Sequence, residues 1–186
     1  MKNFIAAFVA GFLCLCWSNV SWMILPWHKT TIHSFKNDQV VQTAILENIS
    51  SSGKAVYALP AFHGKKEAPK SPQLINEDGT ILRAFVAVVP QAPNGFSPIK
   101  LAYEFGYDFL IALLIAFLIS WANLATFASI LGFTLVIGFI SSVSTNLPNW
   151  NWWGFASDYV LVGMADGMVY SLIIGLVLAL MLKKKA

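Results

Sequence analysis

Long apolar stretches separated by short polar segments dominate the pattern of this chain of 186 residues. Lys, Arg, Asp and Glu are missing from positions 3–25 and 109–157, and positions 159–182 contain a single one, Asp166. About 20 apolar residues in a helix cross the ~30 Å hydrocarbon core of a bilayer. The pattern therefore predicts an all-α membrane protein, a bundle of four transmembrane helices. These helices are expected at residues 1–25 and at about 98–121, 127–147 and 158–182.

Two local signals refine these helices. Ser97 and Pro98 have the residue types of an N-cap and a first helical position, so the second helix is expected to begin near Pro98. The first apolar stretch is not followed by an A-x-A-like cleavage site, so we interpret it as an uncleaved anchor helix.

Residues 26–97 are more polar and predict a small α+β insertion between the first two membrane helices. Ser34 is expected to cap a helix from Phe35 to about Ile49, which ends at 50–53. Apolar runs at 55–59 and 81–89 predict two strands, separated by a loop at 60–79. Because two strands and one helix form little core, we expect the insertion to depend on the outer ends of the membrane helices.

Charge sets the expected orientation. The chain is 57% hydrophobic and 11% charged, whereas soluble domains carry about 25% charged residues. Lys2 and Lys183–Lys185 place both termini in the cytoplasm by the positive-inside rule. Segments longer than about 60 residues are translocated largely regardless of their charge, so the insertion is expected to be extracytoplasmic despite its own basic residues. The net charge of +3, with no basic stripe, argues against nucleic acid as a partner.

Aromatic residues agree with this orientation, because amphipathic rings prefer the membrane–water interface. The candidate interface residues on the outer side are Trp27, His28, Trp150, Trp152 and Trp153.

Small residues recur every four positions in all four apolar stretches. The longest row is Gly163, Gly167, Ser171, Gly175 and Ala179. Small residues at this spacing let membrane helices approach closely, which is consistent either with a homodimer seam or with packing inside one bundle. We expect Gly167→Leu to force helices apart, and Gly11→Leu, outside the rows, to do less.

Asp166 is the main candidate for intramembrane chemistry. It lies seven residues after Tyr159, about 10 Å deep at 1.5 Å per residue. Intramembrane acids are costly and suggest function by default, but a packed, hydrogen-bonded aspartate that locks helices together is the favoured interpretation. The polar residues expected at the same depth are Asn19, Ser18, Ser141, Ser142 and Ser144. Its hydrogen-bond partner is expected to be Asn19, Ser141, Ser142 or Ser144.

Other chemistry is weakly represented. His28, His33 and His63 lie outside the bilayer in this scheme, and the spacing of the first two does not present both to a metal from one helix. No G-x-S-x-G, H-E-x-x-H or phosphate-binding glycine loop occurs. The sequence therefore predicts no catalytic residue and no cofactor. A metal site is not predicted, although the histidines with Asp38 or Glu47 leave one open as a minor alternative.

Two tryptophan-rich segments carry a resemblance. Ser21-Trp22-Met23-Ile24-Leu25-Pro26-Trp27-His28 and Leu147-Pro148-Asn149-Trp150-Asn151-Trp152-Trp153-Gly154-Phe155 resemble segments of a group of small, uncharacterised bacterial inner-membrane proteins. The resemblance implies a multi-pass protein of the bacterial inner membrane and implies no activity.

Three functional hypotheses follow. The first is a non-enzymatic scaffold or accessory subunit in the lipid bilayer, whose insertion binds a protein partner and which could form a homo-oligomer. The alternative is a small transporter or proton-coupled membrane protein that uses Asp166. The third is a binder of metal or lipid on the outer face.

Overall fold

The computed structural model describes residues 1–49, 54–59, 79, 83–89 and 97–184. This part of the chain is mostly helical, with four helices long and apolar enough to cross a membrane and one sheet of two strands. It forms two compact units. The helical unit comprises Met1–His33 and Ser97–Ala186, and the inserted unit comprises Ser34–Phe96. The prediction of a mostly helical chain with four apolar helices is confirmed.

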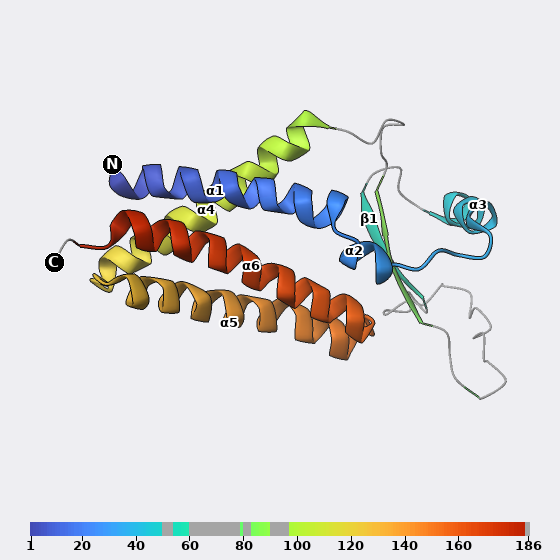
Figure 1. The fold of residues 1–186 in the computed structure, drawn as a ribbon. Coiled ribbons are helices and arrows are strands. Elements are labelled where there is room, and N and C mark those ends of the chain that lie inside the picture. Colours follow the sequence, from blue (N-terminus) through green and yellow to red (C-terminus); the bar gives the residue numbers. More distant parts are fainter. Residues whose placement is uncertain (50–53, 60–78, 80–82, 90–96, 185–186) are drawn as a thin grey trace, which may run out of the picture. The chain divides into compact units, whose positions relative to one another are not determined.

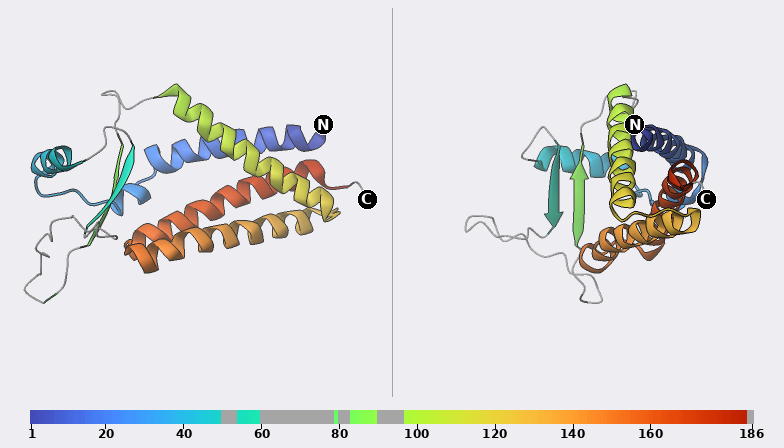
Figure 2. Two further views of the ribbon diagram at one scale, coloured as in Figure 1. Left: turned by 180° about the vertical axis from the view of Figure 1, so that it is seen from behind. Right: turned by 90° about the vertical axis from the view of Figure 1, so that its left-hand side faces the viewer.

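Four long helices and two short turns build the helical unit. In chain order they are α1 Lys2–Asn19, the π-helical turn η1 Val20–Ile24, α2 Trp27–Thr30, α4 Pro98–Trp121, α5 Phe127–Trp153 and α6 Ser157–Leu182. Helix α5 lies alongside α6, α1 contacts α6, and α4 crosses α1 at an angle (Figure 1). Figure 2 shows that the first turn of α1 and the last turn of α6 lie at one end, here called the terminal end. The opposite end, where η1 and α2 follow α1, is called the α2 end.

Cap residues decide where α5 begins and ends. The Thr126 hydroxyl accepts from the Ser129 backbone N–H at 3.1 Å, and the Ser129 hydroxyl accepts from the Thr126 N–H at 3.2 Å. The helix continues through Pro148 to Trp153, six residues beyond the predicted end. Pro148 lacks a backbone N–H and so removes one helical hydrogen bond, but it does not end the helix. The helix ends at Gly154, which has the left-handed conformation of a C-cap with a φ of 70°.

Small side chains form the contact between α5 and α6. A Cβ added at Gly163, Gly167 or Gly175 would lie 2.8, 2.6 or 2.9 Å from a side-chain atom of α5. The atoms concerned belong to Asn146, Ser142 and Leu131. The row predicted on α6 therefore packs against a helix of the same chain, which supports the interpretation as internal packing.

Gly11 marks a second close approach, between the backbones of α1 and α4. A Cβ at Gly11 would lie 2.8 Å from both N and Cα of Phe109. At Gly167 the nearest obstacle is the Ser142 hydroxyl, which can rotate, but the backbone of Phe109 cannot. The prediction that Gly11 tolerates substitution better than Gly167 is therefore wrong.

The inserted unit contains α3 Asp38–Asn48 and the antiparallel strands β1 Ala55–Leu59 and β2 Ala84–Val88. The side chain of Asn37 accepts from the Val40 N–H at 3.1 Å and caps α3. The helix predicted from Phe35, with Ser34 as its cap, thus begins three residues later. None of the described residues of this unit is buried.

Some predictions concern residues outside the described part of the chain. These are the helix end at 50–53, most of the loop at 60–79, the strand positions 81–82 and His63.

We predict that Gly11→Ala lowers the thermal midpoint of the purified protein in detergent by several degrees. Overpacking typically costs about 1–3 kcal/mol, and here the obstacle is backbone. Gly106→Ala on α4 is the matched control, because no atom lies within 4 Å of the added Cβ. Alanine favours the helix, so this control should be as stable as the parent or more so. Equal midpoints for the two variants would show that the α1–α4 approach is not tight.

Candidate functional site

The turn after α1 positions the first group of polar side chains. At η1 the backbone hydrogen bonds change from the α-helical to the π-helical pattern, in which the N–H of Leu25 donates to the Val20 carbonyl five residues earlier at 2.9 Å. Leu25 is extended, as expected before a proline, and α2 begins directly after Pro26. This geometry turns Ser21 and His28 toward α6, where both are buried.

Asp166 of α6 receives these side chains. Trp17 Nε1 donates to Oδ1 of Asp166 at 2.7 Å, and Ser21 Oγ donates to the same oxygen at 2.9 Å. Nε2 of His28 lies 3.3 Å from Oδ2 of Asp166. The residues Asp166, His28 and Ser21 are 8%, 4% and 0% exposed, so both carboxylate oxygens are satisfied without solvent.

Aromatic rings surround the contact between His28 and Asp166. Trp27 Nε1 donates to Ser21 Oγ at 3.0 Å and to the Ser21 carbonyl at 3.2 Å. The Trp22 ring stacks on the His28 ring, with centroids 3.9 Å apart and an interplanar angle of 4°. Trp17 meets Trp27 edge to face at 5.9 Å. Together the residues Trp17, Ser21, Trp22, Trp27, His28 and Asp166 are called the Asp166 cluster.

Serine, histidine and aspartate meet in this cluster, but their contacts differ from those of a nucleophilic triad. In a triad, serine contacts one ring nitrogen and aspartate contacts the other. Here Ser21 and Asp166 both contact Nε2 of His28, and the Ser21 hydroxyl donates a hydrogen bond to Asp166. The Ser21 side chain is also completely buried, which closes its hydroxyl to a substrate. The contacts are those of a packed hydrogen-bond network.

The partners of Asp166 differ from those predicted. Asn19 donates to the Leu15 carbonyl on its own helix, at 2.8 Å, and Ser18 donates to Glu104. Ser144 donates to the Ser141 carbonyl at 3.1 Å. Ser141 and Ser142 line a cavity instead. None of the four predicted partners, Asn19, Ser141, Ser142 and Ser144, is among the hydrogen-bond partners of Asp166, because side chains of α1, η1 and α2 occupy both carboxylate oxygens.

The predicted interface residues divide into two groups. Trp27 and His28 belong to the Asp166 cluster, where His28 is buried and hydrogen-bonded. Trp150, Trp152 and Trp153 are 50%, 79% and 42% exposed at the end of α5, and Trp150 donates to Ser157 Oγ at 3.1 Å.

The sequence interpretation missed Trp17 and Ser21 as partners of Asp166. Their spacing of four residues places both on one face of a helix, and this signal could have suggested a common partner.

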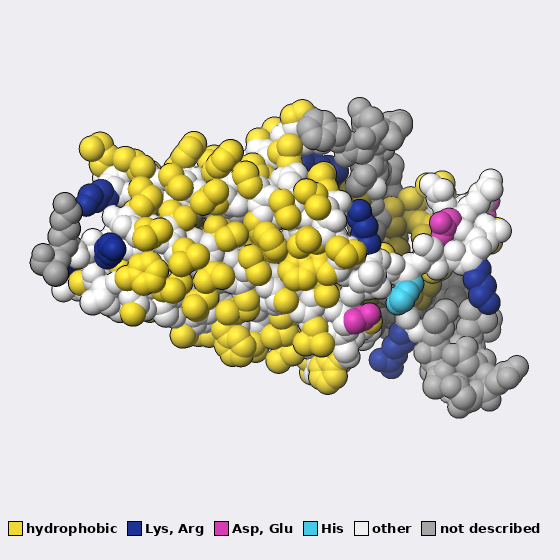
Figure 3. Space-filling model, viewed as in Figure 1, with side chains coloured by type: hydrophobic (Ala, Val, Ile, Leu, Met, Phe, Trp, Pro, Cys, Tyr) yellow, Lys and Arg dark blue, Asp and Glu magenta, His cyan; other side chains and the backbone are white. Residues whose placement is uncertain are grey.

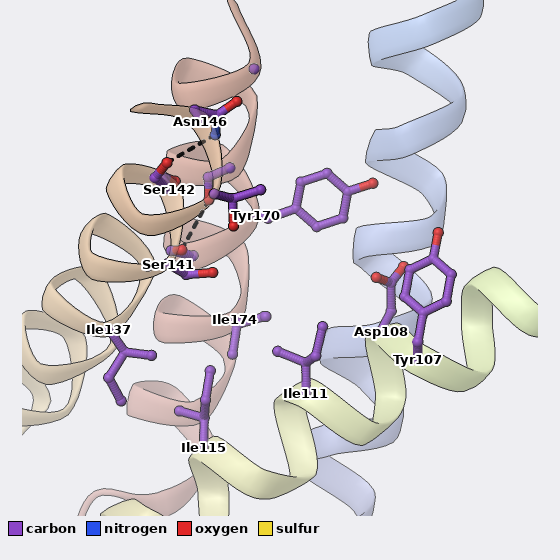
Figure 4. A pocket seen from close by; sticks show the side chains of 15 residues that line it. Tyr107, Asp108, Ile111, Ile115, Ile137, Ser141, Ser142, Asn146, Tyr170 and Ile174 are labelled. Atoms are coloured by element: carbon purple, nitrogen blue, oxygen red, sulfur yellow. Dashed lines mark hydrogen bonds between the residues drawn. The ribbon is translucent and has the colours of Figure 1, made fainter. Parts of the chain in front are cut away.

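A second buried acid, Asp108 of α4, lies in the wall of a cavity of about 380 Å³ between α4, α5 and α6. Figure 4 shows Asp108 and Tyr107 across the cavity from Ser141, Ser142 and Asn146. Asp108 is 3% exposed, and none of the described residues provides a hydrogen bond to its Oδ2. The lower wall is apolar and consists of Ile111, Ile115, Ile137 and Ile174 (Figure 4).

Metal ligands do not gather in the described residues, which contain no group of three His, Cys, Asp or Glu side chains suited to an ion. His28 is engaged by Asp166, and His33 is exposed. The two buried acids are therefore the chemically distinctive groups of this part of the molecule.

The fold defines a class: a mostly helical chain with four helices long and apolar enough to cross a membrane. Comparison with protein-family models, curated proteins and solved structures finds no significant match. The geometry of the buried acids is therefore the basis for assigning a function.

We predict that Asp166→Leu destabilises the protein strongly. It removes the acceptor for Trp17 Nε1 and Ser21 Oγ, and each buried donor left unsatisfied costs about 1–3 kcal/mol. Thermal unfolding in detergent should show a midpoint lower by several degrees, or the variant should fail to accumulate. Asp166→Asn keeps an acceptor oxygen and should be milder. The same leucine at the exposed Asp158 is the control, and equal stability of the two leucine variants would contradict the assigned contacts.

Proposed function

We propose that this chain is a multi-pass protein of a bacterial inner membrane that works as a non-enzymatic scaffold or accessory subunit. The α1–η1 segment, α4, α5 and α6 form its transmembrane bundle, both termini are cytoplasmic, and the inserted unit is extracytoplasmic. One observation carries the proposal: none of the described residues of the inserted unit is buried, although several of them have large apolar side chains.

The surface of the helical unit supports the membrane setting. On the face seen in Figure 3, hydrophobic side chains cover the long helices, and Lys or Arg side chains stand at the terminal end and again toward the opposite end. A basic terminal end fits a cytoplasmic location, and the exposed tryptophans at the end of α5 fit the opposite interface.

The inserted unit supports a role in binding. Five of its large apolar side chains, Phe35, Val40, Leu46, Val56 and Leu59, are at least 60% exposed. Exposed apolar groups that have no core to join are typical of surfaces that bind a partner. The Asp166 cluster lies just before this unit, since His28 precedes Ser34 by six residues. It therefore fixes the point at which the chain leaves the helical unit.

The alternative, a transporter or proton-coupled protein using Asp166, requires this carboxylate to exchange partners during the cycle. Asp166 has both oxygens engaged and does not line the cavity. These contacts favour the structural role for Asp166, and the scaffold remains our proposal.

Complementation of a strain lacking the gene tests this proposal. Leu46→Lys places a charge on an exposed apolar position of α3 and should reproduce the deletion phenotype while the protein accumulates normally. Gln42→Lys adds the same charge to the same helix at an exposed polar position and should complement. Asp166→Asn, if it folds, should also complement. An Asp166→Asn protein of normal stability that fails to complement, beside a functional Leu46→Lys protein, would instead establish the transporter.

Orientation can be tested separately with a membrane-impermeant thiol reagent on intact spheroplasts. A cysteine at Gln39 of α3 should be labelled, and a cysteine at Ala122, in the turn between α4 and α5, should be labelled only after lysis. The parental chain is the control, because Cys14 and Cys16 both lie within α1 and should stay unlabelled. The reverse pattern would contradict the assigned topology.

A further inference from the structure

A buried acid, Asp108, lines the cavity between α4, α5 and α6, and the lining residues include no Lys, Arg or His. Asp108 is almost completely buried, and its Oδ2 has no hydrogen-bond partner among the residues that the structure describes. The residues that line the cavity lie between 107 and 174, and the sequence from 101 to 182 contains no Lys, Arg or His. The basic side chain buried in the helical unit, His28, is already bound to Asp166.

The neighbouring acid adds to this deficit of positive charge. Glu104 lies one helical turn before Asp108 on α4 and accepts a hydrogen bond from the neutral hydroxyl of Ser18. A buried carboxylate is costly in an apolar medium unless it is paired. Because α4, α5 and α6 contribute no cation at this position, a positively charged ligand would supply the charge that pairs with Asp108.

The rest of the wall indicates what the remainder of the ligand is like. Ile111, Ile115, Ile137 and Ile174 form one side, while hydroxyl and amide groups of α5 face Asp108. A mostly apolar cavity with a few convergent polar groups is the usual form of a small-molecule site. We propose that this cavity binds a small organic cation, whose ammonium group pairs with Asp108 and whose apolar body packs against the isoleucines.

Size and ligand chemistry argue against other occupants. About 380 Å³ lies within the usual range for small-molecule sites, but an α-helix of about 10 Å diameter would fill it in roughly one turn. A divalent metal ion requires several oxygen ligands that include more than one carboxylate in most protein sites. Asp108 is the sole carboxylate among the lining residues.

Ligand binding by the full-length protein in phosphatidylglycerol nanodiscs tests the proposal, because this lipid has no amino group. The probe is 2-phenylethylammonium, and the neutral 2-phenylethanol is its control of matched shape. Calorimetry should show that the amine binds the parent about tenfold or more tightly than the alcohol, as expected for a charge-assisted contact. Asp108→Asn should abolish this preference, while Asp158→Asn, an exposed acid with the same charge change, should keep it.

A second variant covers the case in which Asp108→Asn does not fold. Ile111→Trp fills the cavity from a half-exposed position of α4 and leaves Asp108 in place. It should lose binding of the amine and the alcohol together. Equal affinity of the parent for the two probes, a preference retained in Asp108→Asn, or unchanged amine binding by Ile111→Trp would each overturn the proposal.

The same titration in discs containing phosphatidylethanolamine identifies the natural source of the ammonium group. A weaker apparent affinity for the amine would show that the lipid headgroup competes for Asp108. An unchanged affinity would assign the site to free amines.

Discussion

The requirement that a buried carboxylate be hydrogen-bonded shapes the α2 end of the helical unit. Asp166 has little access to solvent, and without donors it would cost several kcal/mol. Its donors come from α1 through Trp17, from η1 through Ser21 and from α2 through His28. The π-helical turn at η1 and the break at Pro26 bring Ser21 and His28 to this carboxylate, and the inserted unit begins at Ser34, six residues after His28.

The two buried acids illustrate two outcomes of the same constraint. Asp166 is satisfied from within the chain, and its partners are locked by stacked and edge-to-face rings. Oδ2 of Asp108 has no donor in the described part of the chain, and the side chain faces a cavity of ligand size. An acid whose bonds are complete holds elements together, whereas one whose bonds are incomplete remains available to a ligand. The acid that the sequence singled out, Asp166, thus has the contacts expected of a structural group.

Hydrophobic patterning predicted the four long helices, and Ser97 with Pro98 predicted the start of α4, because these signals are local. His28 could not be predicted as a partner of Asp166, since its position depends on a π-helical turn and a break at Pro26 that the apolar pattern does not reveal. Gly11 was misjudged because a single glycine opposite a backbone leaves no periodic signal. No local sequence signal singled out Asp108, because its burial depends on how α4 packs against α1.

A double-mutant cycle between Trp17 and Asp166 tests the central claim most directly. The free energy of unfolding would be measured for the parent, Trp17→Phe, Asp166→Leu and the double variant. Trp17→Phe keeps the ring but deletes the donor, so it should cost about 1–3 kcal/mol in the parent and close to nothing in Asp166→Leu. An equal cost in both backgrounds would show that the two side chains are not coupled, and would contradict a structure held together through Asp166.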